Sequence, residues 1–205
     1  MPVTQTQANS KTKILEVALK LFSEKGYEAA SIREICDGAG ITRPTLYYFY
    51  TNKDGVYQAI IESARKDFKE QIEGGLATEG DLREKCKAMA RRSFADAAER
   101  PRLWRFIFGL VWAPDPRHSD QLHDFYEEIN TKIIRAADEA VRTGEIVPGD
   151  NRIRVLVLMG ALSEALSSFL ILGRPKLTPE LADAIIDSIF DGWQSPARNG
   201  KKQAR

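Results

Sequence analysis

The segment at residues 31–57, SIREICDGAGITRPTLYYFYTNKDGVY, constrains local structure more narrowly than any other part of the chain. Its pattern predicts two short helices joined by a tight turn, followed by the start of a longer helix. The first helix opens with Ser31 and carries Glu34 three residues later, which is the spacing of a capping box. Gly40 stands where that helix should end in left-handed backbone. The segment therefore predicts a helix-turn-helix unit.

The second short helix has its own start signals. Thr42 is the expected N-cap, and Pro44 falls in the first turn, where a missing N–H costs nothing. Ile41 and Leu46 have the spacing of a hydrophobic staple. The inward stripe is expected to be Leu46, Phe49 and Tyr50, and the outward residues are Arg43, Thr45, Tyr47 and Tyr48. A short helix with such an outer face is suited to lie in the major groove of DNA.

The segment resembles the tetracycline-repressor (TetR) family of bacterial transcriptional regulators. The signature of that family resembles AGVS-x-x-x-LYYHF-x-x-K, and this chain has AGITRPTLYYFYTNK at residues 39–53. The first helix of the family ends in F-x-x-x-GY, and this chain has ILEVALKLFSEKGYEAAS at residues 14–31. Two positions depart from the pattern. Phe49-Tyr50 replaces the usual histidine or tyrosine followed by phenylalanine, and Gly38 stands where a longer side chain is common.

Every strong pattern after this segment is helical, and no run alternates with the period of a strand. The expected helices cover residues 53–73, 81–99, 103–112, 119–142, 150–172 and 178–193. Gly74-Gly75 should end the first of these, and the helix at 103–112 is apolar on every face, as an enclosed helix would be. We therefore expect an all-α fold of about nine helices. It comprises a three-helix DNA-binding head at residues 1–57 with a flexible arm at 1–10, a ligand-binding and dimerisation domain at 58–194, and a disordered basic tail at 195–205.

Composition adds a few limits. The chain has 205 residues, a formal net charge of +1 and 43% hydrophobic residues, which is enough for a real core. The first ten residues lack a leader pattern, and Cys36 and Cys86 have no paired spacing, so two buried thiols in a reducing cytoplasm are expected. The apolar run at residues 155–172 contains Glu164 and several serines, which argues against a membrane span.

Resemblance and placement together assign the contacts with DNA. We expect these at Ser31, Arg33, Thr42, Arg43, Pro44, Thr45, Tyr47, Tyr48 and Lys53. Arg43 and Thr45 should reach base edges, and Thr42, Tyr47 and Tyr48 should reach phosphate. Lys53 lies at a helix N-terminus and should also contact phosphate. Ser31 and Arg33 should hold the backbone of the opposite strand.

Aromatic residues gather between Phe94 and Tyr126. They form either a well-packed core or an apolar chamber with a few polar groups, the usual composition of a small-molecule site. TetR-like proteins resemble one another in having such a chamber for an inducer. The residues expected to line it are Met89, Phe94, Trp104, Phe108, Trp112, His123 and Tyr126. His118 and His123 are five residues apart, which splays their rings on a helix, so no metal site is expected.

The last two expected helices are too apolar for a monomer of this size. A two-fold dimer through a four-helix bundle would bury them, and the resemblance implies the same arrangement. The expected interface comprises Leu162, Leu166, Phe169, Leu181, Ile185, Ile189 and Trp193. Two reading helices in such a dimer would fit a palindromic site.

These patterns predict a cytoplasmic, ligand-responsive transcriptional regulator that forms a homodimer. We expect a repressor that a small apolar or aromatic inducer releases from a palindromic operator on double-stranded DNA. No enzyme activity, cofactor, metal or membrane partner is expected. Two other classes remain open, namely a helical enzyme with a vestigial head and an architectural or protein-binding module.

Overall fold

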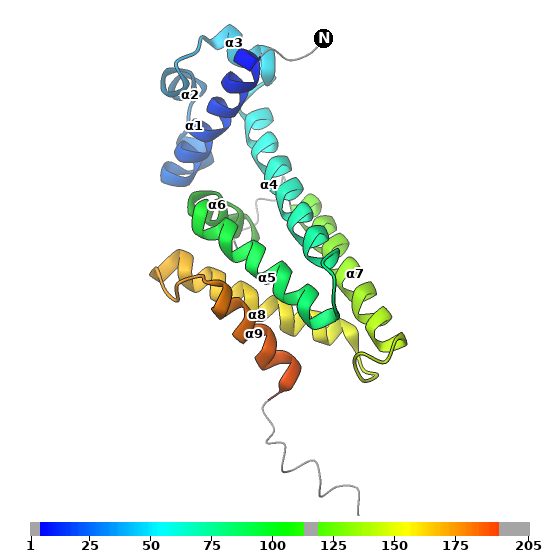
Figure 1. The fold of residues 1–205 in the computed structure, drawn as a ribbon. Helices are drawn as coiled ribbons and strands as arrows, with labels where there is room; N and C mark the ends of the chain where they lie inside the picture. The colour runs from blue at the N-terminus through cyan, green and yellow to red at the C-terminus, as the bar shows by residue number, and fades with distance from the viewer. Residues whose placement is uncertain (1–4, 113–118, 193–205) are drawn as a thin grey trace, which may run out of the picture. The chain divides into compact units, whose positions relative to one another are not determined.

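The computed structural model describes residues 5–112 and 119–192, with side chains described for residues 9–110 and 124–192. The described residues form nine helices and no strand, which confirms the all-α prediction (Figure 1). The helices are α1 (Gln5–Ala29), α2 (Ile32–Ala39), α3 (Arg43–Phe49), α4 (Lys53–Leu76), α5 (Leu82–Glu99), α6 (Pro101–Trp112), α7 (Ser119–Arg142), α8 (Asn151–Leu172) and α9 (Pro179–Asp191).

The chain divides into two compact units. The head unit comprises Met1–Phe68 and Arg100–Leu122, and the body unit comprises Lys69–Glu99 and His123–Arg205. Helix α4 contributes its first part to the head unit and its last turns to the body unit. The head unit thus includes α6 and extends beyond the segment at 1–57 that the sequence indicated. Helix α1 begins at Gln5, inside the expected arm at 1–10, and the expected tail at 195–205 lies outside the described residues.

The head unit forms around one apolar core to which α1, α2, α3, α4 and α6 all contribute. Its fully buried members include Ile14 of α1, Ile35 of α2, Leu46 of α3 and Val56 of α4. Leu110 of α6 is part of the same cluster. Because each helix of the motif anchors at least one side chain here, the core fixes the direction in which α3 presents its outer face.

The body unit contains α5, α7, α8, α9 and the last turns of α4. Helix α9 packs along α5, and α8 lies beside α9 (Figure 1). Ion pairs reinforce the contact between α5 and α9, where Arg91 binds both carboxylate oxygens of Asp183 at 2.5 and 2.6 Å and Lys87 lies 2.8 Å from Asp187. These pairs are partly exposed, so each stabilises the contact only modestly.

The prediction that Gly74-Gly75 ends the long helix is wrong. Helix α4 continues through both glycines to Leu76. A Cβ added at Gly75 would lie 2.3 Å from Met89 Cγ and 2.7 Å from Met89 N. Gly75 therefore serves a close approach of α4 to the backbone of α5, a tertiary requirement that overrides the low helix propensity of glycine.

The segment at 103–112 is also less enclosed than its composition indicated. In the described part of α6, Trp104 and Leu110 are buried, whereas Arg102, Arg105 and Gly109 are exposed. The remaining apolar side chains of the helix are half-buried. The helix packs on one side and faces solvent on the other.

Helix α8 is apolar on two opposite faces. One face is buried and carries Val155, Leu158, Leu162, Leu166 and Leu170. The other is exposed and carries Ile153, Leu156, Val157, Ile171 and Leu172, which are between 51% and 79% exposed. By length and mean hydropathy (2.1) α8 passes a test for a membrane span, but a third of its apolar window is buried within the protein. A soluble helix with two apolar faces needs a second packing partner.

Candidate nucleic-acid interface

Hydrogen bonds at both ends of α2 fix the turn that leads to α3. At its start, the Glu34 N–H donates to Ser31 Oγ at 3.3 Å, and the Ser31 N–H donates to Glu34 Oε2 at 3.0 Å. At its end, Gly40 is left-handed with a φ of 67°, and the Ile41 N–H donates to the Cys36 carbonyl at 3.0 Å. This is a Schellman motif, which satisfies carbonyls left open at a helix end. The predicted capping box and glycine cap are both confirmed.

The Glu34 carboxylate accepts several hydrogen bonds in this capping box. The Lys25 ammonium and the Ser31 hydroxyl donate to its two carboxylate oxygens, the latter at 2.7 Å. These donors, Lys25 first, lower the pKa of Glu34 to about 2. The Ser31 hydroxyl proton is therefore engaged, and a contact from Ser31 to a DNA phosphate would require its backbone N–H or hydroxyl to leave Glu34.

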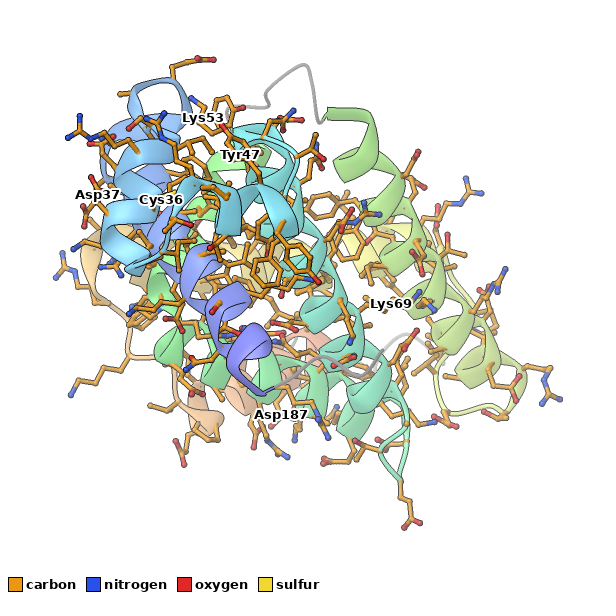
Figure 2. The ribbon with its side chains drawn as sticks, turned by 90° about the horizontal axis from the view of Figure 1, so that it is seen from above. Cys36, Asp37, Tyr47, Lys53, Lys69 and Asp187 are labelled. Carbon is orange, nitrogen blue, oxygen red and sulfur yellow. The ribbon has the colours of Figure 1, made fainter. Side chains whose placement is uncertain are left out.

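The outer face of α3 is exposed, as expected. Thr42 caps the helix, because its Oγ1 accepts the Thr45 N–H at 3.3 Å, and the two threonine hydroxyls lie 2.9 Å apart. Tyr47 and Tyr48 are 51% and 72% exposed, whereas Leu46 is fully buried. Figure 2 labels Tyr47 on this helix. The helix therefore separates a packed face from a face that presents phenol and hydroxyl groups to solvent.

The two arginines near the turn differ in their surroundings. Arg43 is exposed and has no hydrogen bond or ion pair with any described residue. The Arg33 guanidinium lies 3.7 Å from the Asp37 carboxylate on the surface of α2, and both side chains are exposed. Asp37, labelled in Figure 2, would repel a phosphate bound by Arg33. The sequence analysis did not predict this ion pair, although Arg33 and Asp37 have the i,i+4 spacing at which such pairs form on a helix.

Lys53 is engaged inside the head unit. Its ammonium donates to the carbonyls of Tyr27, Glu28 and Ala30 at 2.8, 3.3 and 3.0 Å, and it lies 4.2 Å from the centre of the Tyr27 ring. An ammonium has three protons, and these three carbonyls use all of them. Lys53 therefore ties the end of α1 to the start of α4, and a phosphate contact would cost one of these bonds.

Gly38 has a packing role that explains its departure from the family pattern. A Cβ at this position would lie 2.7 Å from Val17 Cγ1, so the glycine lets α2 approach α1 closely. Phe49 is half-buried, and its ring contacts that of Tyr48 at 5.0 Å. The next residue, Tyr50, is 7% exposed, and its buried hydroxyl has no hydrogen-bond partner among the described residues. Burial raises the pKa of Tyr50 to about 12.

The two thiols are buried, as the sequence indicated. Cys36 is 3% exposed in the head unit and Cys86 is 2% exposed in the body unit, and neither forms a disulfide. Burial raises the pKa of both thiols, to about 12 for Cys86. Thiolate is the reactive form of cysteine, so both side chains are inert in the folded protein.

The residues expected to line a ligand chamber fall in both units. Met89 and Phe94 of α5 are each 1% exposed in the body unit, and Tyr126 of α7 is 37% exposed there. Trp104 and Phe108 of α6 contact each other in the head unit with ring centres 6.1 Å apart. The side chains of Trp112 and His123 lie outside the described residues. None of the seven is among the residues that line two cavities in the described part of the chain, one of about 650 Å³ in the body unit and one of about 470 Å³ in the head unit.

The residues expected at a dimer interface differ in how deeply they are buried within their own protomer. Leu162 and Leu166 are buried within their own body unit, at 7% and 5% exposed, so they have little surface left for a second protomer. Half-buried positions are held by Phe169, Leu181, Ile185 and Ile189, and Trp193 lies outside the described residues. The sequence pattern selected the face of α8 that packs internally, because both faces are apolar and periodicity cannot tell them apart.

No group of three or more His, Cys, Asp or Glu residues is arranged to hold a metal ion in the parts of the chain that the structure describes. His118 and His123, the residues considered for such a site, lie outside the described side chains. The outer face of α3 offers hydrogen-bond donors and the guanidinium of Arg43, which has no partner among the described residues. It is suited to binding and presents no constellation for chemistry among the described residues.

Taken together, the capped turn and the exposed α3 define a helix-turn-helix protein with an appended helical body. Residues 14–60 match the family described as bacterial regulatory proteins, tetR family. The match covers α1 from Ile14, the two motif helices and the start of α4, which is the part of the chain that is shown to be similar to that family.

Individual proteins resemble this chain either in the sequence of one segment or in the fold of most of the chain. The transcriptional regulator UidR of Escherichia coli K12 is 41% identical over 75 residues, which cover 34% of this chain and 38% of that protein. The chain thus spans well under half the length of the curated relatives it matches at that identity. Among solved structures, PfmR from Thermus thermophilus has a TM-score of 0.72 at 22% identity, covering 89% of this chain and 96% of that chain. FadR from Bacillus subtilis, solved in complex with stearoyl-CoA, has a TM-score of 0.74 at 16% identity, covering 89% and 99%. At these identities, the two structures show that the fold is shared.

Proposed function

We propose that this protein is a ligand-responsive transcriptional regulator that binds DNA through α3. The observation that carries the proposal is the outer face of α3, where Arg43 has no partner among the described residues and Tyr47 and Tyr48 are exposed. A guanidinium left unpaired on a helix that is capped, short and packed on its other side is available to a base edge. Arginine binds guanine O6 and N7 in a bidentate manner, the commonest specific contact in the major groove.

The surroundings of these side chains support different roles for the expected contact residues. We assign Arg43 and Thr45 to base edges, and Thr42, Tyr47 and Tyr48 to phosphates, with Pro44 fixing the first turn. Ser31 and Arg33 stay secondary candidates, because both are engaged with acidic side chains. Lys53 holds the end of α1, so we assign it to positioning the head and not to phosphate.

We further propose that the regulator works as a two-fold dimer joined through the exposed face of α8. Leu156 and Ile171 on that face are 71% and 79% exposed, and the half-buried residues Leu181, Ile185 and Ile189 of α9 would complete the interface. A dimer of this kind supports a palindromic operator, whose half-sites lie about 34–36 Å apart. If this face of α8 is buried between protomers, it does not need a membrane to cover it. We therefore propose that the dimer is cytoplasmic.

The ligand is proposed to act by a shift in population. Helix α4 belongs to both units, so a ligand that favours another arrangement of the body would move the first residues of α4 and the motif tied to them by Lys53. A repressor would then leave its operator. The buried Oε1 of Gln71 on α4 has no partner among the described residues and would accept a hydrogen bond from a ligand. FadR of Bacillus subtilis binds stearoyl-CoA, so acyl thioesters join small aromatic compounds as candidate inducers here.

The test is a footprint on the DNA that flanks the coding region of this protein, with and without candidate inducers. In the Arg43→Ala variant, we expect the free energy of binding to the specific site to weaken by about 1–3 kcal/mol. The variant should also discriminate less between bases at one position of the site. Arg152→Ala removes an equal charge from an exposed position of α8 and should leave the footprint unchanged. Equal weakening on specific and random DNA by Arg43→Ala would reject the assignment of this residue to a base edge. Protection that is insensitive to sequence in the unaltered protein would favour an architectural role instead.

A further inference from the structure

The body unit contains a cavity of about 650 Å³ that none of the residues expected to line the aromatic chamber borders. It is bounded by the start of α5, the end of α7, the loop between α7 and α8, the start of α8 and the end of α9. Its buried wall is apolar and includes Cys86, Ile133, Ala137, Val155 and Leu158, all at most 5% exposed. Small-molecule sites commonly have about 300–1,000 Å³ and such apolar walls with a few polar groups.

Of the four charged residues on the rim, Arg83 is paired with acids, whereas Asp81 and Glu145 accept hydrogen bonds from neutral groups. Glu145 accepts the Leu82 N–H at 2.9 Å and the Thr143 hydroxyl at 3.1 Å. Asp81 accepts the Glu84 N–H at 2.9 Å, so both acids cap the start of α5. The guanidinium of Arg83 binds the carboxylates of Asp187, labelled in Figure 2, and Asp191.

Of the two arginines on the rim, Arg154 is the one whose charge has no ionic partner among the described residues. Its guanidinium donates to Asn151 Oδ1 at 2.9 Å and to the Val147 carbonyl at 2.8 Å, and both acceptors are neutral. Two bonds leave three of its five N–H groups unused. A positive charge at the edge of an apolar cavity, held in place but not neutralised, attracts an anionic group.

The surroundings hold this guanidinium in position. Asn151 is 7% exposed, and its amide donates to Asp138 Oδ1 at 2.7 Å, which orients the oxygen that Arg154 binds. A Cβ at Gly149 would lie 2.6 Å from Arg154 Nη2, so the loop leaves room for the guanidinium to lie against it. A side chain fixed in this way loses little entropy when a ligand binds, which favours affinity.

We propose that this cavity is a binding site for a small anion with an apolar body, whose carboxylate or similar group binds Arg154. The apolar body lies against the wall formed by Cys86, Ile133, Ala137, Val155 and Leu158. A cationic group cannot replace the carboxylate at Arg154, because like charges repel. All of the residues that line the site belong to the body unit, so its test does not depend on the proposed binding of DNA.

The test is isothermal titration calorimetry on the full chain without DNA, using octanoate, its neutral amide octanamide, and octylamine as probes. We expect octanoate to bind at least tenfold more tightly than octanamide, and octylamine not to bind. Arg154→Gln should remove this tenfold preference. Arg152→Gln, which removes the same charge from an exposed position two residues away, should keep it.

The position of the site is tested separately by Ala137→Phe, which places a ring in the apolar wall. Binding of octanoate should be lost while the circular dichroism and thermal midpoint stay close to those of the unaltered protein. If Ala137→Phe does not fold, the comparison of Arg154→Gln with Arg152→Gln decides alone. The proposal is overturned if no probe binds, if octanamide binds as tightly as octanoate, or if Arg154→Gln binds octanoate as the unaltered protein does. None of these outcomes bears on the footprint, which tests the head.

Discussion

The two adjacent glycines near the end of α4 offer a matched pair of substitutions with opposite expected signs. A Cβ at Gly75 would meet the backbone and side chain of Met89 at 2.3–2.8 Å, and backbone atoms cannot move aside without shifting α5. A Cβ at Gly74 would lie 3.1 Å from the Arg92 guanidinium, the free end of a flexible side chain. One position is therefore closed to a methyl group, and its neighbour is open to it.

Two effects decide the magnitudes. Replacing glycine by alanine inside a helix stabilises it by up to about 1 kcal/mol. Overpacking a filled contact costs about 1–3 kcal/mol. Gly74→Ala should therefore raise the free energy of unfolding by up to about 1 kcal/mol, whereas Gly75→Ala should lower it by roughly 1–2 kcal/mol.

The assay is thermal unfolding followed by circular dichroism, at one protein concentration for all three proteins. For a chain of this size, a change of 1 kcal/mol moves the midpoint by about 2–4 °C, so the two variants should differ by several degrees. If Gly75→Ala is as stable as Gly74→Ala, α4 and α5 do not approach as closely as described. A close approach to α5 would then not explain why α4 contains glycine at position 75.

Three further predictions concern the head and the exposed face of α8. Tyr50→Phe removes a buried hydroxyl without a described partner and should raise the free energy of unfolding by about 1 kcal/mol; a fall of that size in urea titration would reveal a partner. Glu34 has a folded pKa of about 2 against 4.5, so its contribution to stability is complete above pH 4.5 and is lost as the pH falls toward 2. The difference in thermal midpoint between the unaltered protein and Glu34→Gln should shrink over that range, and a constant difference would contradict the pairing with Lys25. Leu156→Glu places a charge on the exposed face of α8 and should give monomers in sedimentation velocity, whereas Val147→Glu, at a residue 73% exposed in the loop before α8, should leave dimers intact.

The sequence predicted the elements of the head well because their signals are local. The capping box of Ser31 and Glu34, the left-handed Gly40 and the cap at Thr42 each depend on residues within a few positions of one another. Such rules act on the chain before any tertiary contact forms. They therefore survive in the folded protein.

The failures share a different physical cause. Nothing local reveals that Gly75 faces the backbone of α5, that Lys53 reaches back to carbonyls more than twenty residues earlier, or which of the two apolar faces of α8 is buried. Each depends on contacts between residues distant in the sequence. That Arg154 has no ionic partner among the described residues was likewise invisible, because this depends on which acids the loops bring near. Periodicity identifies an apolar helix but does not say which of its sides meets the core.

The burial of both native thiols has a practical consequence. Cys36 and Cys86 are each at most 3% exposed and stay protonated at neutral pH, so maleimide reagents should pass over the folded protein. A single cysteine introduced at Tyr48 would then be the one site to accept a spin label, without first removing the natural cysteines. Pulsed electron resonance between two such labels would measure the head-to-head separation in the dimer directly, with and without inducer.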